Sequence, residues 1–297
     1  MYKCKFAGLQ VGSYPGSYER NWTILAQKTE ELILRERPYL ISYSELMTAP
    51  YFGTIQDDKF FSYAETMNGP TVIKTTEMAV AYDVHILGTF FEKAEENGQN
   101  NYYNTAFICS PTKGLIGKYR KVHLPKLQSP SLSTDEKYYF EQFGGGGKEF
   151  PVFTLDNGLK VGILICFDRS FPEGWKALTV QGVDVVIVPT ATFGFRKDLY
   201  VKELQIRAME NNVFVLGVNK AGIEQIQGEP SARHHFGNSC LIDPFGEVIS
   251  QLEDEEWSYL VGEIDLSLAA SSKGRINWNQ ERKPEIYQKY LKNYLKI

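Results

Sequence analysis

A cysteine stands where an apolar segment of this chain gives way to polar residues. Residues 161–165 read Val-Gly-Ile-Leu-Ile, which predicts a buried strand, and Cys166 follows directly. Asp168 and Arg169 come next, and Pro172 can open a helix at its first position. Open α/β sheets place their ligands and reacting groups at such strand-to-helix turns. Cys166 is therefore a candidate nucleophile, although taken alone it fits a small buried hydrophobic residue equally well.

A thiol becomes a strong nucleophile only after a base has removed its proton, and a nearby cation stabilises the resulting charge. Glu45 stands between two largely apolar runs, residues 39–43 and 46–52, so its carboxylate is a candidate base that could later act as an acid. Lys121 belongs to a basic run that ends in Val-His-Leu-Pro, and its ammonium could stabilise the thiolate and an oxyanion. Each also has a purely structural interpretation, Glu45 as a helix cap and Lys121 as part of a solvated face.

The elements that must position these residues are strands and helices in alternation. Strands are expected at residues 39–43, 85–91, 102–109, 160–165, 183–189 and 213–218. Helices are expected at residues 69–82, 173–181, 197–211 and 281–295, and in a run that Asn21 caps and that ends before Pro38. No linker or low-complexity segment interrupts this order. The pattern predicts one α/β domain with layered sheets across residues 1–297.

The bulk composition excludes several classes of protein. The formal net charge of −4 argues against nucleic acid or an anionic membrane as the main partner. The N-terminus has no apolar signal core, and no apolar run approaches the roughly 18 residues of a membrane span, so a cytoplasmic location is expected. The 4 cysteines lie far apart without a CxxC pair, which predicts free thiols and no zinc site.

Three segments in this order resemble the signature segments of the nitrilase, or carbon–nitrogen hydrolase, superfamily. Residues 43–46 read Tyr-Ser-Glu-Leu, residues 119–125 read Tyr-Arg-Lys-Val-His-Leu-Pro, and residues 166–173 read Cys-Phe-Asp-Arg-Ser-Phe-Pro-Glu. The resemblance covers residues 5–266, which leaves residues 267–297 as a C-terminal extension of the same domain. It implies a four-layer α-β-β-α sandwich that pairs through one helical layer, so that a homodimer or a higher homo-oligomer is expected.

The resemblance also implies a catalytic Glu-Lys-Cys triad, which maps onto Glu45, Lys121 and Cys166. Many members carry a second active-site glutamate after the lysine segment, matched here by Glu136, with Glu141 as a rival. In the implied mechanism Glu45 takes the thiol proton, and the thiolate attacks a carbon that is bonded to nitrogen. Water then cleaves the thioester, and neither a metal nor an organic cofactor is needed.

In that mechanism Lys121 and the backbone N–H of Phe167 stabilise the tetrahedral oxyanion, and Glu136 orients Lys121, the substrate or the water. The residues after Cys166 also resemble the amidase and carbamoylase branches, because true nitrilases tend to have Trp-Glu there. Arg169 resembles an arginine that grips the substrate carboxylate in carbamoylases, a role that suits a bidentate guanidinium. A structural ion pair for Arg169 is equally open.

The pocket walls are expected to come from residues that follow the buried strands. Four of them follow the strand at residues 183–189, namely Thr190, Ala191, Thr192 and Phe193. Arg196 is a second possible anion partner, and Asn219 is a polar pocket residue or a turn former. The adjacent His234 and His235 are assigned to a loop, because neighbouring histidines rarely face one ion.

The leading functional interpretation is an amidohydrolase of N-carbamoyl amino acids or amines that releases ammonia. The alternatives left open are an ω-amidase or aliphatic amidase of small acids, a nitrilase, a Cys-His acyl hydrolase with His123 as base, and a catalytically inert binding module. In every catalytic interpretation the partner is a small molecule. The C-terminal helix carries Tyr287, Tyr290 and Leu291 at helical spacing, either as a dimer surface or packed on its own chain.

Overall fold

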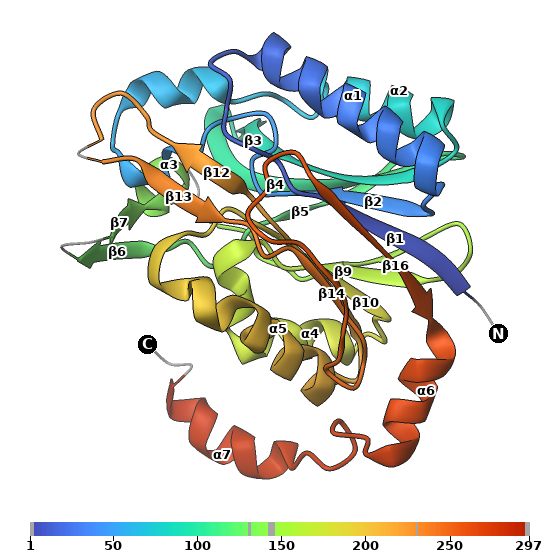
Figure 1. Cartoon of the computed structure of the whole chain (residues 1–297). Helices are drawn as coiled ribbons and strands as arrows, with labels where there is room; N and C mark the ends of the chain where they lie inside the picture. Colours follow the sequence, from blue (N-terminus) through green and yellow to red (C-terminus); the bar gives the residue numbers. More distant parts are fainter. Residues whose placement is uncertain (1–2, 130–131, 142–145, 230, 295–297) are drawn as a thin grey trace.

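The computed structural model describes residues 3–129, 132–141, 146–229 and 231–294. Within these ranges the chain forms two six-stranded sheets that lie face to face between two layers of helices (Figure 1). This is the α-β-β-α order, so the predicted fold class is confirmed. None of the helices in the described ranges is both long and apolar enough to cross a membrane.

The first sheet contains the strand that precedes Glu45 and the strand that precedes Lys121. Its order is β16-β1-β2-β3-β4-β5, with parallel pairing between β1, β2 and β3 and antiparallel pairing elsewhere. The predicted pairing of residues 85–91 with residues 102–109 is confirmed by β3 and β4. The strands are β1 (Lys3–Leu9), β2 (Leu40–Tyr43), β3 (His85–Glu96), β4 (Gln99–Ser110), β5 (Gly114–Arg120) and β16 (Tyr259–Asp265).

The second sheet contains the strand that precedes Cys166. Its order is β15-β14-β11-β10-β9-β8, and its three central strands β9, β10 and β11 are parallel. β10 and β11 are buried along their whole length, as expected for parallel strands that are covered on both faces. The strands are β8 (Val152–Thr154), β9 (Lys160–Ile163), β10 (Val185–Thr190), β11 (Phe214–Asn219), β14 (Cys240–Ile242) and β15 (Val248–Gln251).

Four helices bury their apolar stripes on the outer faces of these sheets. Helices α1 and α2 share one core cluster with the first sheet, and α4 and α5 share another with the second (Figure 1). A third cluster lies between the sheets and includes Phe6, Leu87 and Ile187. The helices are α1 (Tyr18–Glu36), α2 (Pro70–Ala81), α3 (Glu136–Phe140), α4 (Pro172–Thr179), α5 (Lys197–Asn211), α6 (Leu266–Arg275) and α7 (Pro284–Tyr294).

Short elements surround one edge of the sandwich. Two hairpins, β6–β7 and β12–β13, stand apart from the main sheets, and four 3₁₀ turns lie in the described connections. The hairpin strands are β6 (Lys126–Ser129), β7 (Leu132–Asp135), β12 (Ala221–Glu224) and β13 (Arg233–Phe236). The 3₁₀ turns span Phe52–Thr54, Asp58–Tyr63, Cys166–Ser170 and Gly194–Arg196.

The start of α1 differs from the prediction. Ser17, not Asn21, is the N-cap, and its side chain accepts a hydrogen bond from the Arg20 N–H. Asn21 lies inside the helix, is buried, and donates its side-chain amide to the carbonyl of Met47 at 2.8 Å. The asparagine therefore anchors the segment that follows Glu45 to α1.

Strand direction explains where a site can form. β2, β9, β10 and β11 are central strands, and β5 runs in the same direction as β3 because both pair antiparallel with β4. Glu45 lies just beyond β2, Lys121 directly beyond β5, and Cys166 beyond β9. The carboxyl ends of these strands therefore meet at one edge of the sandwich, where open α/β folds place ligands.

Candidate active site

The Cys166 thiol stands on a strained turn. Cys166 has φ of 49° and begins the 3₁₀ turn Cys166–Ser170, a left-handed conformation that costs energy for a residue with a Cβ. The buried Asp168 carboxylate accepts the Ile165 N–H at 3.0 Å, and Arg169 Nη1 donates to the Cys166 carbonyl at 2.7 Å. These bonds hold the turn that presents the sulfur.

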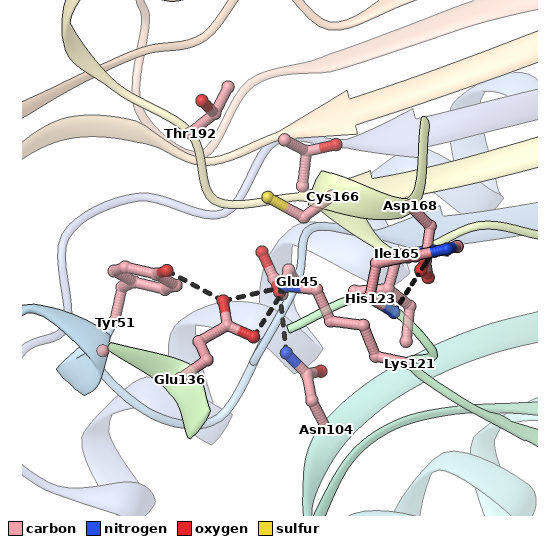
Figure 2. Close-up of polar contacts among 12 residues, drawn as sticks. Glu45, Tyr51, Asn104, Lys121, His123, Glu136, Ile165, Cys166, Asp168 and Thr192 are labelled. Carbon is pink, nitrogen blue, oxygen red and sulfur yellow. Dashed lines mark hydrogen bonds and ion pairs between the residues drawn. The ribbon is translucent and has the colours of Figure 1, made fainter. Parts of the chain in front are cut away.

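Lys121 lies between two buried carboxylates (Figure 2). Its Nζ is 2.7 Å from Glu45 Oε1 and 2.8 Å from both carboxylate oxygens of Glu136. Glu136 is the first residue of α3, and its N–H donates to the Pro125 carbonyl at 2.9 Å. The rival Glu141 is solvent-exposed and pairs with Lys137, so Glu136 is the glutamate that contacts the lysine.

Two further side chains complete this cluster. Asn104 Nδ2 donates to Glu45 Oε1 at 2.7 Å, and the Tyr51 hydroxyl donates to Glu136 Oε1 at 2.8 Å. The other carboxylate oxygen, Glu45 Oε2, is buried without a hydrogen-bond partner among the described residues. A buried acceptor is rarely left unpaired, so this oxygen is free to receive a proton from the thiol or a hydrogen bond from a ligand.

Burial dominates the electrostatics of the site. Loss of hydration, together with the Glu45 charge, raises the pKa of Cys166 to about 12, although Lys121 and Arg169 act in the opposite direction. Loss of hydration also raises the pKa of Glu136 to about 7. Burial alone would lower the pKa of Lys121, but the carboxylates of Glu136 and Glu45 raise it, so the amine stays charged. The resting thiol is protonated and needs a base.

His123 has a different set of partners. Its Nδ1 lies 2.8 Å from Asp168 Oδ1, and its ring stacks on Phe171 with centroids 3.8 Å apart. The same Asp168 also accepts the Tyr119 hydroxyl at 2.6 Å. Figure 2 shows His123 beside Asp168, while the Cys166 sulfur points away toward Glu45 and Glu136. This arrangement disfavours His123 as the base for the thiol.

A small cavity of about 60 Å³ opens onto the thiol. Its wall includes five residues that the sequence predicts for the site, namely Phe167, Arg169, Ala191, Thr192 and Phe193. The other lining residues are Tyr51, Pro125, Leu127, Thr134, Cys166, Phe195 and Arg196.

Thr190 and Asn219 are not among the residues that line this cavity. The Thr190 hydroxyl donates to the Val188 carbonyl at 3.0 Å, back into the sheet. The Asn219 side chain accepts the Thr192 N–H at 2.9 Å and donates to the Gly237 carbonyl at 2.9 Å. Both are the last residues of their strands, so their side chains support the loops while the next residues reach the cavity.

Arg169 is engaged by the protein itself. Its Nε lies 3.1 Å from Glu203 on α5, and its guanidinium lies over the Tyr200 ring at 5.1 Å from the centroid. The residue as a whole is 2% exposed. These contacts, with the bond to the Cys166 carbonyl, favour the structural alternative for Arg169.

Tyr51, Asn104 and Thr134 were not predicted as site residues. Asn104 is a buried polar residue in a predicted strand, and that was the only available signal for it. The backbone of Tyr51 is held from the β12–β13 hairpin, where Glu224 accepts its N–H at 2.8 Å and Arg233 donates to its carbonyl at 3.0 Å. Such contacts join residues more than 170 positions apart, and no local pattern reveals them.

The assignment of His234 and His235 to a loop was wrong, since both lie in β13. Successive strand residues face opposite sides, so His234 is exposed near Asp254 while His235 is buried. Within the described ranges, no group of three His, Cys, Asp or Glu side chains could hold a metal ion.

Comparison with known proteins places this geometry in a family. The family model described as "Carbon-nitrogen hydrolase" matches residues 6–273. The chain is 30% identical to the N-carbamoylputrescine amidase of Arabidopsis thaliana over 262 residues, which cover 85% of this chain and 84% of that protein. It is 32% identical to a nitrilase of Pyrococcus abyssi over 254 residues, 84% of this chain and 86% of that one.

A solved structure shows the same fold. The carbon-nitrogen hydrolase from Helicobacter pylori G27 matches with a TM-score of 0.87 and 22% identity, over 98% of this chain and 99% of that one. The family match spans all three strands that deliver Glu45, Lys121 and Cys166. The chain therefore belongs to the carbon–nitrogen hydrolase family and is an enzyme that hydrolyses carbon–nitrogen bonds.

Proposed function

We propose that this enzyme is a cysteine amidohydrolase that removes ammonia from the carbamoyl group of an N-carbamoyl compound. The observation that carries the proposal is the unpaired Glu45 Oε2, buried beside the Lys121 ammonium at the edge where Cys166 presents its thiol. A base, a cation and a nucleophile are the three groups that acyl transfer through a thioester requires.

The first half-reaction forms a covalent intermediate. Glu45 takes the proton of the Cys166 thiol, and the thiolate attacks the carbamoyl carbon. The carbonyl oxygen becomes an oxyanion that Lys121 and the Phe167 N–H stabilise. Glu45 returns the proton to the departing nitrogen, so that ammonia leaves and a thioester remains on Cys166.

The second half-reaction uses water. Glu45 again acts as base, water attacks the thioester carbon, and the sulfur leaves as a thiol after receiving the proton. For a carbamoyl substrate the product is a carbamic acid, which loses carbon dioxide to give the free amine. Glu136 orients Lys121 throughout, because both of its oxygens contact the ammonium.

Two observations support a carbamoyl substrate over other carbon–nitrogen bonds. The chain shares 30% identity with the N-carbamoylputrescine amidase over most of both proteins. The Phe-Asp-Arg segment after Cys166 also resembles the carbamoylase and amidase branches. Because the chain is also similar to a nitrilase, and the same thiolate can attack a nitrile carbon, nitriles are included among the substrates to be tested.

The test is ammonia release from matched panels of N-carbamoyl compounds, ω-amides and nitriles. We expect turnover of the carbamoyl panel, and its loss in Cys166→Ala. The matched control is Cys109→Ala, because Cys109 is also a buried thiol but packs in the cluster between the first sheet and helices α1 and α2.

Turnover confined to ω-amides or nitriles would leave the cysteine chemistry in place and overturn the carbamoyl assignment. Activity that survives in Cys166→Ala would overturn the proposed nucleophile. No turnover of any panel, with a folded protein and an unreactive Cys166 thiol, would favour the inert binding module.

A further inference from the structure

The cavity wall carries two guanidinium groups but no carboxylate. Arg169 and Arg196 both line the cavity, and its other described lining residues include no Asp, Glu, Lys or His. The catalytic carboxylates of Glu45 and Glu136 lie deeper, on either side of Lys121. The wall is therefore positively charged, while the catalytic cluster behind it is not.

One nearby carboxylate neutralises only part of this charge. Glu203 Oε2 lies 3.1 Å from Arg169 Nε and 3.5 Å from Arg196 Nη1, so a single negative charge is shared by two cations. The Arg169 side chain is 3% exposed, whereas the Arg196 side chain is 27% exposed. The remaining positive charge therefore faces the solvent-accessible side of the cavity at Arg196.

Arg196 also has donor capacity that the protein leaves unused. Its Nη1 donates to the Ser170 hydroxyl at 3.3 Å, and no hydrogen bond joins its Nη2 to another residue in the described part of the chain. A guanidinium carries five N–H donors in a planar fork that matches a carboxylate. The aromatic rings of Phe193 and Phe195 also line the cavity, and the Arg196 guanidinium lies over the Phe195 ring at 5.7 Å from its centroid.

We propose that Arg196, and not Arg169, binds an anionic group of the substrate, so that the substrate class is the ureido acids. This inference rests on the proposed function and narrows it to carbamoyl compounds that carry a carboxylate. The carbamoyl group lies at Cys166, and the carboxylate lies at the cavity mouth, away from Glu45 and Glu136. A substrate with an ammonium in place of this carboxylate would place its positive charge beside Arg196, and the described cavity wall has no carboxylate to bind it.

The test compares three ureas that differ only at the far end: 3-ureidopropionate, propylurea and 2-aminoethylurea carry a carboxylate, a methyl group and an ammonium at the same position. We expect kcat/KM for the carboxylate to exceed that for the methyl compound by about ten- to hundredfold, the range of one charge-assisted contact. The ammonium compound should be the poorest of the three. Arg196→Gln should bring the first two within about threefold by removing this contact.

Lys197→Gln is the matched control, because it removes one positive charge from the neighbouring exposed residue, which does not line the cavity. Lys197→Gln should leave the preference for 3-ureidopropionate over propylurea unchanged. Equal loss of the preference in Lys197→Gln would mean that net charge, not a contact at Arg196, sets it. A preference that persists in Arg196→Gln would overturn the assignment to Arg196.

Calorimetry on the Cys166→Ala variant separates this proposal from the proposed function. If no urea is hydrolysed, the carbamoyl assignment fails, and the binding of succinamate against butyramide decides the anion site in its place. Tighter binding of succinamate that depends on Arg196 supports the site. Equal binding of the two amides, or binding of neither, overturns it.

Discussion

At the scale of single residues, the proposed mechanism pairs a protonated thiol with a buried base. Burial raises the pKa of Cys166 to about 12, so the thiolate is scarce at neutral pH. In the proposed mechanism, Glu45 Oε2, which has no hydrogen-bond partner among the described residues, accepts the thiol proton. The site therefore differs from a thiolate–imidazolium pair, in which the nucleophile is ionised before the substrate arrives.

Glu45→Gln should abolish this base while keeping the size of the side chain. We expect kcat/KM to fall by roughly 10²–10⁴-fold, the usual contribution of general acid–base catalysis. The thermal midpoint should change little, because Glu136 still pairs with Lys121. Steady-state kinetics of Glu45→Gln beside Glu141→Gln, an exposed control, test the role. A loss below about threefold would rule Glu45 out as the base.

The pKa of Glu136, which burial raises to about 7, predicts the pH dependence. Below that pH Glu136 is protonated, and Lys121 then interacts with the charge of Glu45 alone. Lys121 has then lost one of its two carboxylate partners and is held less firmly, so kcat/KM should decline as the pH falls through about 7. In Glu136→Gln this decline should be absent and activity should be low at every pH. If kcat/KM of Glu136→Gln still declined at low pH as in the parent enzyme, a group other than Glu136 would cause the decline.

At the scale of elements, Asp168 joins two segments that must meet. Its carboxylate accepts the Ile165 N–H at the Cys166 turn, and it accepts the His123 N–H and the Tyr119 hydroxyl from the segment that carries Lys121. The end of β5 and the strained turn after β9 are thus held by one buried side chain. Asp168 is a positioning residue in this arrangement.

Asp168→Asn should loosen this junction, because an amide nitrogen cannot accept hydrogen bonds from these donors. We expect a loss of about 2–4 kcal/mol in the free energy of unfolding, since buried donors are left without an acceptor. Chemical denaturation measures the loss, and the rate of Cys166 alkylation by iodoacetamide reports the position of the thiol. Glu173→Gln, at an exposed position on α4, is the control. Unchanged alkylation in a destabilised variant would reduce Asp168 to a purely structural role.

At the scale of the whole molecule, the C-terminal helix is unusual. α7 stands at the end of the chain below α4 and α5 in Figure 1, and its apolar residues Ile286, Tyr287, Tyr290 and Leu291 are exposed. An exposed apolar helix face is typical of an interaction surface. The observation favours the dimer alternative for this helix over packing on its own chain.

The homodimer is therefore expected to depend on α7. Sedimentation equilibrium should give twice the mass of one chain, and a variant that ends before Pro284 should dissociate more readily. Its thermal unfolding at low concentration should stay close to that of the full chain, because the apolar residues named on α7 are not part of the core. A full-length chain that sediments only as monomer at micromolar concentration would contradict the expectation.

The cytoplasmic location and the single domain over residues 1–297 also stay predictions.

The sequence by itself determined the elements and predicted which residues are the candidate reacting groups. Alternation of apolar runs and turn residues is a local property, so the strands before Glu45 and Cys166 and the helices α2, α4 and α5 could be predicted to within a few residues. The ordered signature segments identified the family, and the match over residues 6–273 agrees. Even so, the predicted N-cap of α1 was wrong by four residues, because both Ser17 and Asn21 are residue types that can cap a helix.

Only the tertiary structure decided how these groups are paired. Tyr51 reaches Glu136, Asn104 reaches Glu45, and the charge of Glu203 is divided between two arginines, each through contacts distant in sequence. Local patterns carry no information about such contacts, because burial and distance follow from how the sheets pack. The same packing buried Arg169 against Glu203 and left Arg196 partly exposed on the cavity wall, a difference that the residue types alone could not predict.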